Sequence, residues 1–185
     1  MLVTSPSITL VPAAIRLGLA PLPLAPLSLA ANHVVRSVIG RHPRLFARLG
    51  AHMGKRFLLE PSDLPFAFLL EPNAGEPRVT VARPGQGGPS DARIAGPLSA
   101  LLGLVHGVFD GDALFFSRDI VIEGDVEAVL ALRNALDDAE LDLLAETAAA
   151  LGPLAAPFER IVRMISPAVT QITGLPLTRM RNDPL

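Results

Sequence analysis

The sequence predicts an α+β fold: a small, mostly antiparallel sheet of about five strands, covered by helices, with extra helices at both ends of the chain. Half of the 185 residues are hydrophobic and only 18% are charged, so a sizeable core is available. Short runs with period-two spacing occupy the middle of the chain, and helical spacing precedes and follows them. We therefore divide the chain into an apolar, basic N-terminal part (1–52), a sheet-bearing part (53–137) and C-terminal helices (138–185).

The first 31 residues are apolar, with Arg16 as their only charge and with five prolines. Three of these prolines interrupt the uncharged run 17–31, which is also shorter than a bilayer-spanning helix requires. Ser28 and Ala30 have the spacing of a signal-peptide cleavage site, but no cluster of basic residues precedes them. We expect this segment to be retained and to lie against the body of the protein or in a membrane interface.

Residues 27–51 have helical periodicity, with an aliphatic and phenylalanine face. Gly40 and Pro43 are expected to divide the segment into two short helices. The two faces stay distinct only if these helices remain nearly collinear. The opposite face carries four arginines, which we predict to contact a membrane: Arg36, Arg41, Arg44 and Arg48.

The middle of the chain has the pattern of β-strands. Turn residues occupy 71–76 and 84–89, and the spacing between runs favours antiparallel pairing over β-α-β units. The expected strands are Arg56–Glu60, Phe66–Glu71, Arg78–Arg83 and Asp91–Ala95, with a further strand or strand pair over Ala113–Glu123.

The second half of the chain is predicted to be mainly helical. Asp125 is a suitable N-cap, and Glu127 falls in the first turn, where the helix dipole favours an acidic side chain. The expected helices span Pro97–His106, Gly124–Leu136, Asp137–Gly152 and 154–172.

The net charge of −2 averages two oppositely charged regions. No acidic residue precedes Glu60, and the basic residues of that stretch give it a charge of +7, whereas the remainder carries −9. An apolar, basic N-terminal part indicates contact with anionic lipid or nucleic acid. Because interleaved aromatic side chains are missing, we favour an anionic membrane surface and expect no nucleic acid partner. The alternative is that the arginines only decorate solvated helices.

Catalytic and metal-binding patterns are missing from the sequence. The chain has no cysteine, which excludes disulfides, zinc–thiolate sites and thiol catalysis. It also lacks a nucleophile elbow, a phosphate-binding loop and a dinucleotide fingerprint. We therefore expect no enzyme activity, no metal and no cofactor. The four histidines have no metal-ligand spacing: His33, His42, His52 and His106.

Aliphatic and phenylalanine side chains in the sheet-bearing part (53–137) exceed what a small domain needs to close its core. Each is ordinary core when taken singly, but together they are compatible with a lined cavity. An acyl or isoprenoid tail placed there would gain about 0.8 kcal/mol per buried CH₂ group. The predicted lining residues are Phe66, Phe68, Leu101, Leu104, Leu114, Phe116, Val129 and Leu132.

The segments Gly111–Asp125 and Ala128–Asp137 resemble the closing strand and helix of the sterol carrier protein type-two family. Within that family they are most similar to the UbiT-type accessory factors of bacterial ubiquinone biosynthesis. Ile120 and Val126 depart from that group's motif, where leucine and threonine stand. The residues that match it include Phe115, Phe116, Arg118, Gly124 and Asp125.

The resemblance implies a sheet and helices that enclose a hydrophobic tunnel, and a protein that carries lipid without chemistry of its own. Its cargo would be a polyprenylated ubiquinone intermediate or a membrane lipid. Its partners would be the peptidase-U32-like hydroxylase pair of oxygen-independent ubiquinone synthesis, and it would be cytoplasmic and peripheral at the inner membrane.

Other functions remain open from the sequence. One alternative is an interaction protein with a filled core, whose terminal helices would form a homo-oligomer or a hetero-complex. The chain could equally be a general phospholipid or fatty-acyl carrier. An enzyme acting on lipids would be indicated by loss of turnover when His106 or Asp112 is replaced by alanine.

Overall fold

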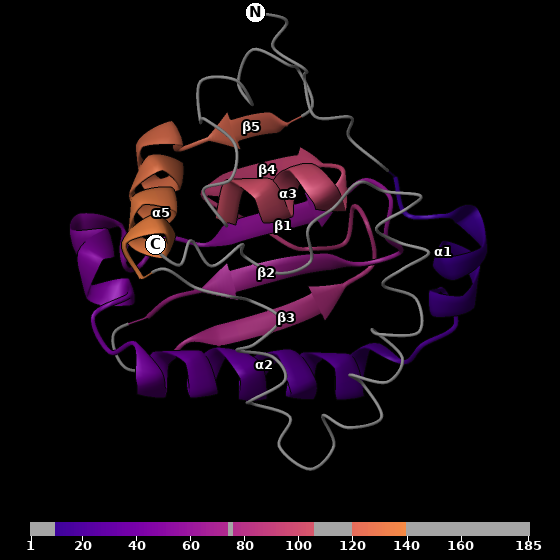
Figure 1. Ribbon diagram of the computed structural model, residues 1–185, viewed down its shortest axis with the longest axis horizontal. Helices are drawn as coiled ribbons and strands as arrows, with labels where there is room; N and C mark the ends of the chain where they lie inside the picture. Colours follow the sequence, from indigo (N-terminus) through magenta and orange to yellow (C-terminus); the bar gives the residue numbers. More distant parts are fainter. Residues whose placement is uncertain (1–9, 74–75, 106–119, 140–185) are drawn as a thin grey trace, which may run out of the picture.

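The computed structural model describes residues 10–73, 76–105 and 120–139. In this part of the chain, five strands form one sheet, with helices on one face and along one edge (Figure 1). The strands are β1 (Phe57–Pro61), β2 (Ala67–Glu71), β3 (Arg78–Ala82), β4 (Ala92–Gly96) and β5 (Val121–Gly124). The helices are α1 (Ala13–Leu19), α2 (Leu24–Arg41), the 3-10 helix η1 (Phe46–His52), α3 (Leu98–Val105) and α5 (Val126–Asp138). The predicted α+β class is confirmed.

The strand order is β3-β2-β1-β4-β5, and three of the four neighbouring pairs are antiparallel. The central pair, β1 with β4, is parallel, so the expectation of antiparallel pairing fails at this one place. The chain reaches β4 through residues 83–91, which cross the sheet. A Cβ atom on Gly87 would lie only 2.3 Å from Cδ1 of Leu58, so this crossover rests directly on the sheet.

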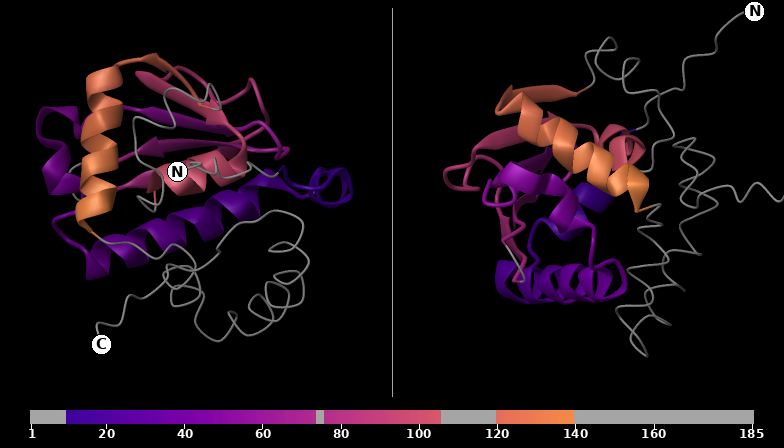
Figure 2. Two further views of the ribbon diagram at one scale, coloured as in Figure 1. Left: turned by 45° about the horizontal axis from the view of Figure 1, so that its top comes forward. Right: turned by 90° about the vertical axis from the view of Figure 1, so that its left-hand side faces the viewer.

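The two faces of the sheet differ because side chains alternate along each strand. Phe57 and Leu59 of β1 point to the face covered by α3 and α5, since both pack with residues of these helices. Figure 2 shows the two helices on the same side of the sheet. Leu58 and Glu60 point to the opposite face, where Leu58 forms a small apolar cluster with two residues of β2. We refer to these as the helix-covered face and the crossover face.

Helix α2 differs from its prediction at both ends. It begins at Leu24, three residues earlier than expected, because Pro26 falls in the first turn, where a helix does not need its N–H. It also continues through Gly40 and ends at Arg41, so Gly40 does not break it. His42 leaves the helical conformation before Pro43, and η1, in purple at the left of Figure 1, does not continue the direction of α2. The two helices are therefore not collinear.

Helix α3 is held by a side chain from the loop after β1. The buried carboxylate of Asp63 accepts hydrogen bonds from the N–H of Leu98 and from the N–H of Val11, both at 2.8 Å. Pro97 precedes the helix, and its carbonyl accepts the first helical hydrogen bonds, so α3 begins one residue later than predicted. Asp63 thus fixes the start of α3 and the approach to α1 at one end of the sheet.

The junction between β5 and α5 agrees with the sequence. Asp125 is the N-cap, and its side chain accepts from the N–H of Ala128 at 3.0 Å. Gly124 has φ +84°, and a Cβ atom there would lie 2.3 Å from the carbonyl oxygen of Asp91. At the other end, α5 includes Asp137 and Asp138, so these two residues complete this helix and do not begin the next. The helices predicted beyond them lie outside the described residues.

Candidate functional site

In the part of the chain that the structure describes, the helix-covered face carries a large buried cluster, which we call the helix-covered cluster. Its centre is formed by Phe57 and Ile94, on neighbouring strands, which are 0% and 1% exposed. The cluster consists of Val38, Leu45, Phe46, Leu49, Phe57, Ala92, Ile94, Ala100, Leu101, Ala128, Val129, Leu132 and Ala135. Four residues of the N-terminal part (1–52) therefore share one core with the sheet: Val38, Leu45, Phe46 and Leu49.

Three of the eight predicted lining residues meet in the helix-covered cluster. Leu101 of α3 is 7% exposed, and Val129 and Leu132 of α5 are 2% and 4% exposed. They come from two helices that cover the same face of the sheet (Figure 1). Any apolar ligand held between α3, α5 and the sheet would contact these three side chains.

Phe68 and Phe66 have different surroundings. Phe68 of β2 is half-buried and lies opposite Leu59 in the register of β1 and β2. Phe66 is buried outside the helix-covered cluster, and the guanidinium of Arg83 lies 5.4 Å from its ring centroid. The remaining predicted positions, the side chain of Leu104 together with Leu114 and Phe116, lie outside the described part.

Half-buried aliphatic side chains surround the helix-covered cluster. They come from α2, the strands, α5 and residues next to these elements and η1: Val34, Val35, Ile39, Met53, Leu59, Leu70, Ile120, Ile122, Ala131, Leu136 and Ala139. Leu59 and Leu70 were not among the predicted lining residues, although period-two spacing aligns them with Phe57 and Phe68. This period-two spacing is the sequence pattern from which Leu59 and Leu70 could have been predicted to lie on the same face.

The four predicted membrane-contact arginines are all exposed, but they do not lie on one straight helix. Arg36 and Arg41 belong to α2, Arg44 lies in the turn after it, and Arg48 belongs to η1. Arg48 forms an ion pair with Asp138 at the end of α5. Arg44 and Arg48 also line a pocket of about 330 Å³ between this turn and α5.

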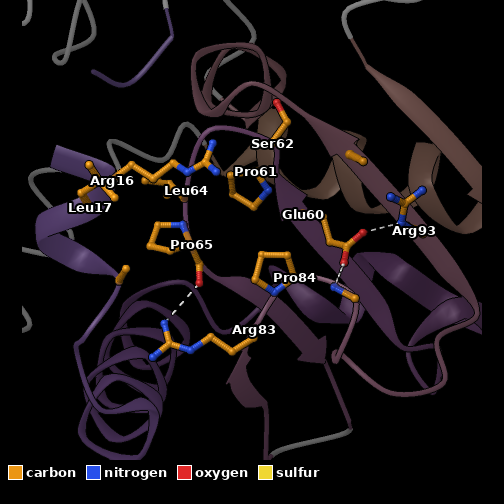
Figure 3. A pocket seen from close by; sticks show the side chains of 13 residues that line it. Arg16, Leu17, Glu60, Pro61, Ser62, Leu64, Pro65, Arg83, Pro84 and Arg93 are labelled. Atoms are coloured by element: carbon orange, nitrogen blue, oxygen red, sulfur yellow. Dashed lines mark hydrogen bonds and ion pairs between the residues drawn. The ribbon is translucent and has the colours of Figure 1, made fainter. Parts of the chain in front are cut away.

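A larger pocket, of about 810 Å³, lies at the α1 end of the crossover face (Figure 3). We call it the α1 pocket. Its walls come from α1, the end of β1 with the following loop, the residues after β3, and β4. Its apolar lining includes Leu17, Leu64 and the prolines at 61, 65 and 84, and its charged lining is Arg16, Glu60, Arg83 and Arg93.

Glu60 is held in an ion-pair network at one side of the α1 pocket. One carboxylate oxygen lies 2.5 Å from Nε of Arg93, and the other accepts the N–H of Gly85 at 3.0 Å. Arg93 also contacts Glu123 at 2.9 Å. The hydrogen bond from Gly85, assisted by Arg93, lowers the pKa of Glu60 against the opposing effect of burial. The charge of Arg93 is therefore compensated within the protein.

Arg83 and Arg16 differ from Arg93 in their partners. Arg83 donates to the carbonyl oxygens of Leu22 at 3.0 Å and Pro65 at 3.4 Å, which orient it without neutralising its charge. The side chain of Arg16 is exposed and has no hydrogen-bond or ion-pair partner in the described part. Figure 3 shows the two guanidinium groups on either side of Pro65.

Among the described residues, no three histidine, aspartate or glutamate side chains are grouped so that they could hold a metal ion. His106 and Asp112, which would carry the enzymatic alternative, lie outside that part. No described helix alone has the length and hydropathy to cross a bilayer. Helices α1 and α2 pass these two criteria only as a pair, which is bent by 102°.

A mixed five-stranded sheet with helices over one apolar face places this protein among the sterol-carrier-like α+β domains. A solved structure described as UbiJ-SCP2 ubiquinone synthesis protein is 22% identical, with a TM-score of 0.51, over 64% of this chain and 96% of its own. Sterol carrier protein 2 from Yarrowia lipolytica, in its apo form, is 16% identical over 58% and 87% of the two chains, with a TM-score of 0.43. The sterol carrier protein domain 2 of Helicoverpa armigera is 16% identical over 55% and 78%, with a TM-score of 0.39.

The sequence profile described as the SCP-2 sterol transfer family matches residues 37–137, which is more than half of the chain. The protein therefore belongs to the SCP-2 sterol transfer family, and the resemblance inferred from Gly111–Asp137 is confirmed. No curated protein is significantly similar to this chain in sequence.

Proposed function

We propose that this protein is a non-enzymatic lipid-binding accessory factor that holds a polyprenylated ubiquinone intermediate for oxygen-independent ubiquinone biosynthesis. The observation that carries the proposal is its membership of the SCP-2 sterol transfer family, matched over residues 37–137. The similarity in fold to a protein described as a ubiquinone synthesis protein supports the choice of pathway. The motif within Gly111–Asp137 supports the UbiT-type subgroup.

The prenyl tail would lie between the sheet and the helices α3 and α5. Leu101, Val129 and Leu132 would contact it from the helices, and Phe68 from the sheet. Transfer of ten CH₂ groups from water to this site would contribute roughly 8 kcal/mol before the costs of binding. The proposed lining is completed by Leu104, Leu114 and Phe116, and would include Phe66 only if the tail extends beyond the helix-covered cluster. No catalytic side chain is required for this role.

The proposed factor would meet its cargo at the cytoplasmic face of the inner membrane. Arg36, Arg41 and Arg44 are exposed in a stretch without acidic residues, and each basic residue near an anionic surface contributes about 1 kcal/mol. The peptidase-U32-like hydroxylase pair would be the recipient of the bound intermediate.

A filled core is the competing function, and one observation favours it. The helix-covered cluster is continuous, and Val129 and Leu132 are nearly inaccessible. Under this alternative, the helices would serve to assemble a homo-oligomer or a hetero-complex and no lipid would enter.

Two phenylalanine variants on α5 separate these functions. Leu132→Phe adds volume at a buried position, whereas Leu130→Phe adds the same volume at a position that is 40% exposed. Titration with a short-chain prenylated quinone is expected to show weaker binding for Leu132→Phe and unchanged binding for Leu130→Phe, with both variants folded by circular dichroism. A folded wild-type protein with no measurable binding would favour the filled core. Light scattering of the full chain would then test for assembly.

A further inference from the structure

Among the described residues, the α1 pocket is lined by more positive than negative side chains. Glu60 compensates Arg93 in the network described above. Arg83 is held in place by two main-chain carbonyls and the ring of Phe66, and Arg16 has no partner in the described part. An oriented guanidinium that is bonded only to neutral groups attracts an anion more strongly than one already paired with a carboxylate.

Apart from Ser62, the uncharged lining of the α1 pocket is apolar. Leu64 and Pro65 are half-buried in its floor, and Leu17, which is 73% exposed, lies at its α1 side. The volume of about 810 Å³ falls within the range of sites that hold small organic ligands. A ligand that satisfies both features has an anionic end and a short apolar portion.

We propose that the α1 pocket binds the oxyanion head of an aliphatic amphiphile, with Arg16 and Arg83 on the anion and Leu17 and Leu64 against the first part of its chain. The pocket lies on the crossover face, whereas the proposed prenyl site lies on the helix-covered face. This second site does not depend on the lipid-carrier function. Its ligand could be part of a lipid bilayer or a free molecule, and the two share the same head-group chemistry.

The test is a titration of full-length protein followed by ¹H–¹⁵N NMR, with decyl phosphate, inorganic phosphate and the neutral amphiphile decyl maltoside. Amides of Ala20, Ser62 and Gly85 report on the α1 pocket, and those of Ala100 and Ala135 report on the helix-covered cluster. Decyl phosphate is expected to shift the pocket amides, with an affinity at least about ten-fold above those of the other two compounds.

Arg16→Gln is expected to weaken decyl phosphate binding at the pocket amides by about five-fold or more. Arg78→Gln removes an exposed charge at the start of β3, outside the α1 pocket, and is expected to have no effect. Equal affinities for wild type and Arg16→Gln, or equal shifts with decyl maltoside, would overturn the proposal. If inorganic phosphate bound as tightly as decyl phosphate, the proposed contact of Leu17 and Leu64 with the aliphatic chain would be wrong. Shifts confined to Ala100 and Ala135 would support the prenyl site and reject this one.

Discussion

The side-chain amide of Asn32 on α2 pairs with both backbone groups of Val79 on β3. Its Oδ1 accepts the N–H of Val79 at 2.9 Å, and its Nδ2 donates to the carbonyl of Val79 at 2.6 Å. One turn earlier, Oγ of Ser28 accepts the N–H of Val81 at 2.9 Å. Four residues of helix rise by about 6 Å, and two residues of strand by about 6.6 Å, so the two spacings match. Helix α2 thus closes the β3 edge of the sheet with side-chain hydrogen bonds.

Replacing Asn32 with alanine leaves the N–H and the carbonyl of a buried valine without partners. Because an unsatisfied buried backbone group costs about 1–3 kcal/mol, Asn32→Ala is expected to lower the free energy of unfolding by about 2–4 kcal/mol. Ser28→Ala, which removes one such bond, is expected to cost roughly half as much. Urea denaturation measures both, with the exposed Asn134→Ala on α5 as control. Equal stability of Asn32→Ala and Asn134→Ala would contradict this account of the edge.

Alanine substitutions at two glycines with similar backbone conformations distinguish the cost of backbone strain from the cost of a steric clash. Gly124 and Gly88 have φ of +84° and +78°, but a Cβ atom collides with the carbonyl of Asp91 only at Gly124. Gly88→Ala is therefore expected to cost about 1 kcal/mol, and Gly124→Ala at least about 2 kcal/mol more. Thermal unfolding compares the two variants. A Gly124→Ala protein as stable as Gly88→Ala would mean that the β4–β5 contact is not as close as described.

The contacts of Glu60 lead us to expect that the free energy of unfolding falls in acid. Its pKa is lowered by the hydrogen bond from Gly85 and by Arg93, so the folded state holds the ionised form more strongly than the unfolded state does. The resulting stabilisation is complete above the unfolded pKa of about 4.3 and is lost as the pH falls through the lower folded value. Glu60→Gln is expected to be less stable by about 1–2 kcal/mol at pH 7.

The pH profile of this difference distinguishes an electrostatic role from a packing role. Denaturation of wild type and Glu60→Gln between pH 7 and pH 3 is expected to show the two stabilities converging below about pH 4. If the difference in stability between the two proteins stays constant over this range, the negative charge of Glu60 does not contribute to stability.

Because Arg36 and Arg44 are exposed, we expect the protein to bind anionic vesicles. Arg36→Gln combined with Arg44→Gln is expected to weaken binding to phosphatidylglycerol-containing vesicles by about thirty-fold, at roughly 1 kcal/mol per charge. Arg56→Gln, whose side chain is paired with Asp91 at 3.8 Å, removes a charge elsewhere and serves as control. Vesicle co-sedimentation at increasing salt measures the effect. Equal losses in the arginine pair and in the control would argue for solvated arginines without a membrane role.

Much of the fold follows from local patterns in the sequence. Period-two runs place β1 to β4 within one residue of their observed bounds, because alternating burial repeats directly in the sequence. Asp125 was identifiable as an N-cap because capping needs only a short polar side chain at one position. The parallel pairing of β1 with β4 was not predictable in this way, since it depends on how the crossover 83–91 passes over the sheet.

The contacts that position α2 and form the α1 pocket were likewise not predictable from local sequence patterns. Ser28 looked like part of a cleavage site, yet its hydroxyl is bonded to β3, more than fifty positions away in the chain. Arg16, Arg83 and Arg93 are scattered in the sequence and line one pocket only because α1, the residues after β3 and strand β4 come together. Contacts at such separations leave no periodic signal. Of the proposed lipid site, the sequence identified Leu101, Val129 and Leu132 because they lie on apolar helix faces.

Native mass spectrometry of the full-length protein, purified without detergent, tests the lipid-binding function most directly. The account predicts an additional mass bound to the folded protein, released on collisional activation and identified as a prenylated quinone precursor. Leu132→Phe is expected to carry less of it, and Leu130→Phe the same amount as wild type. A folded wild-type protein that carries no lipid, and that acquires none when incubated with a prenylated quinone, would contradict the account.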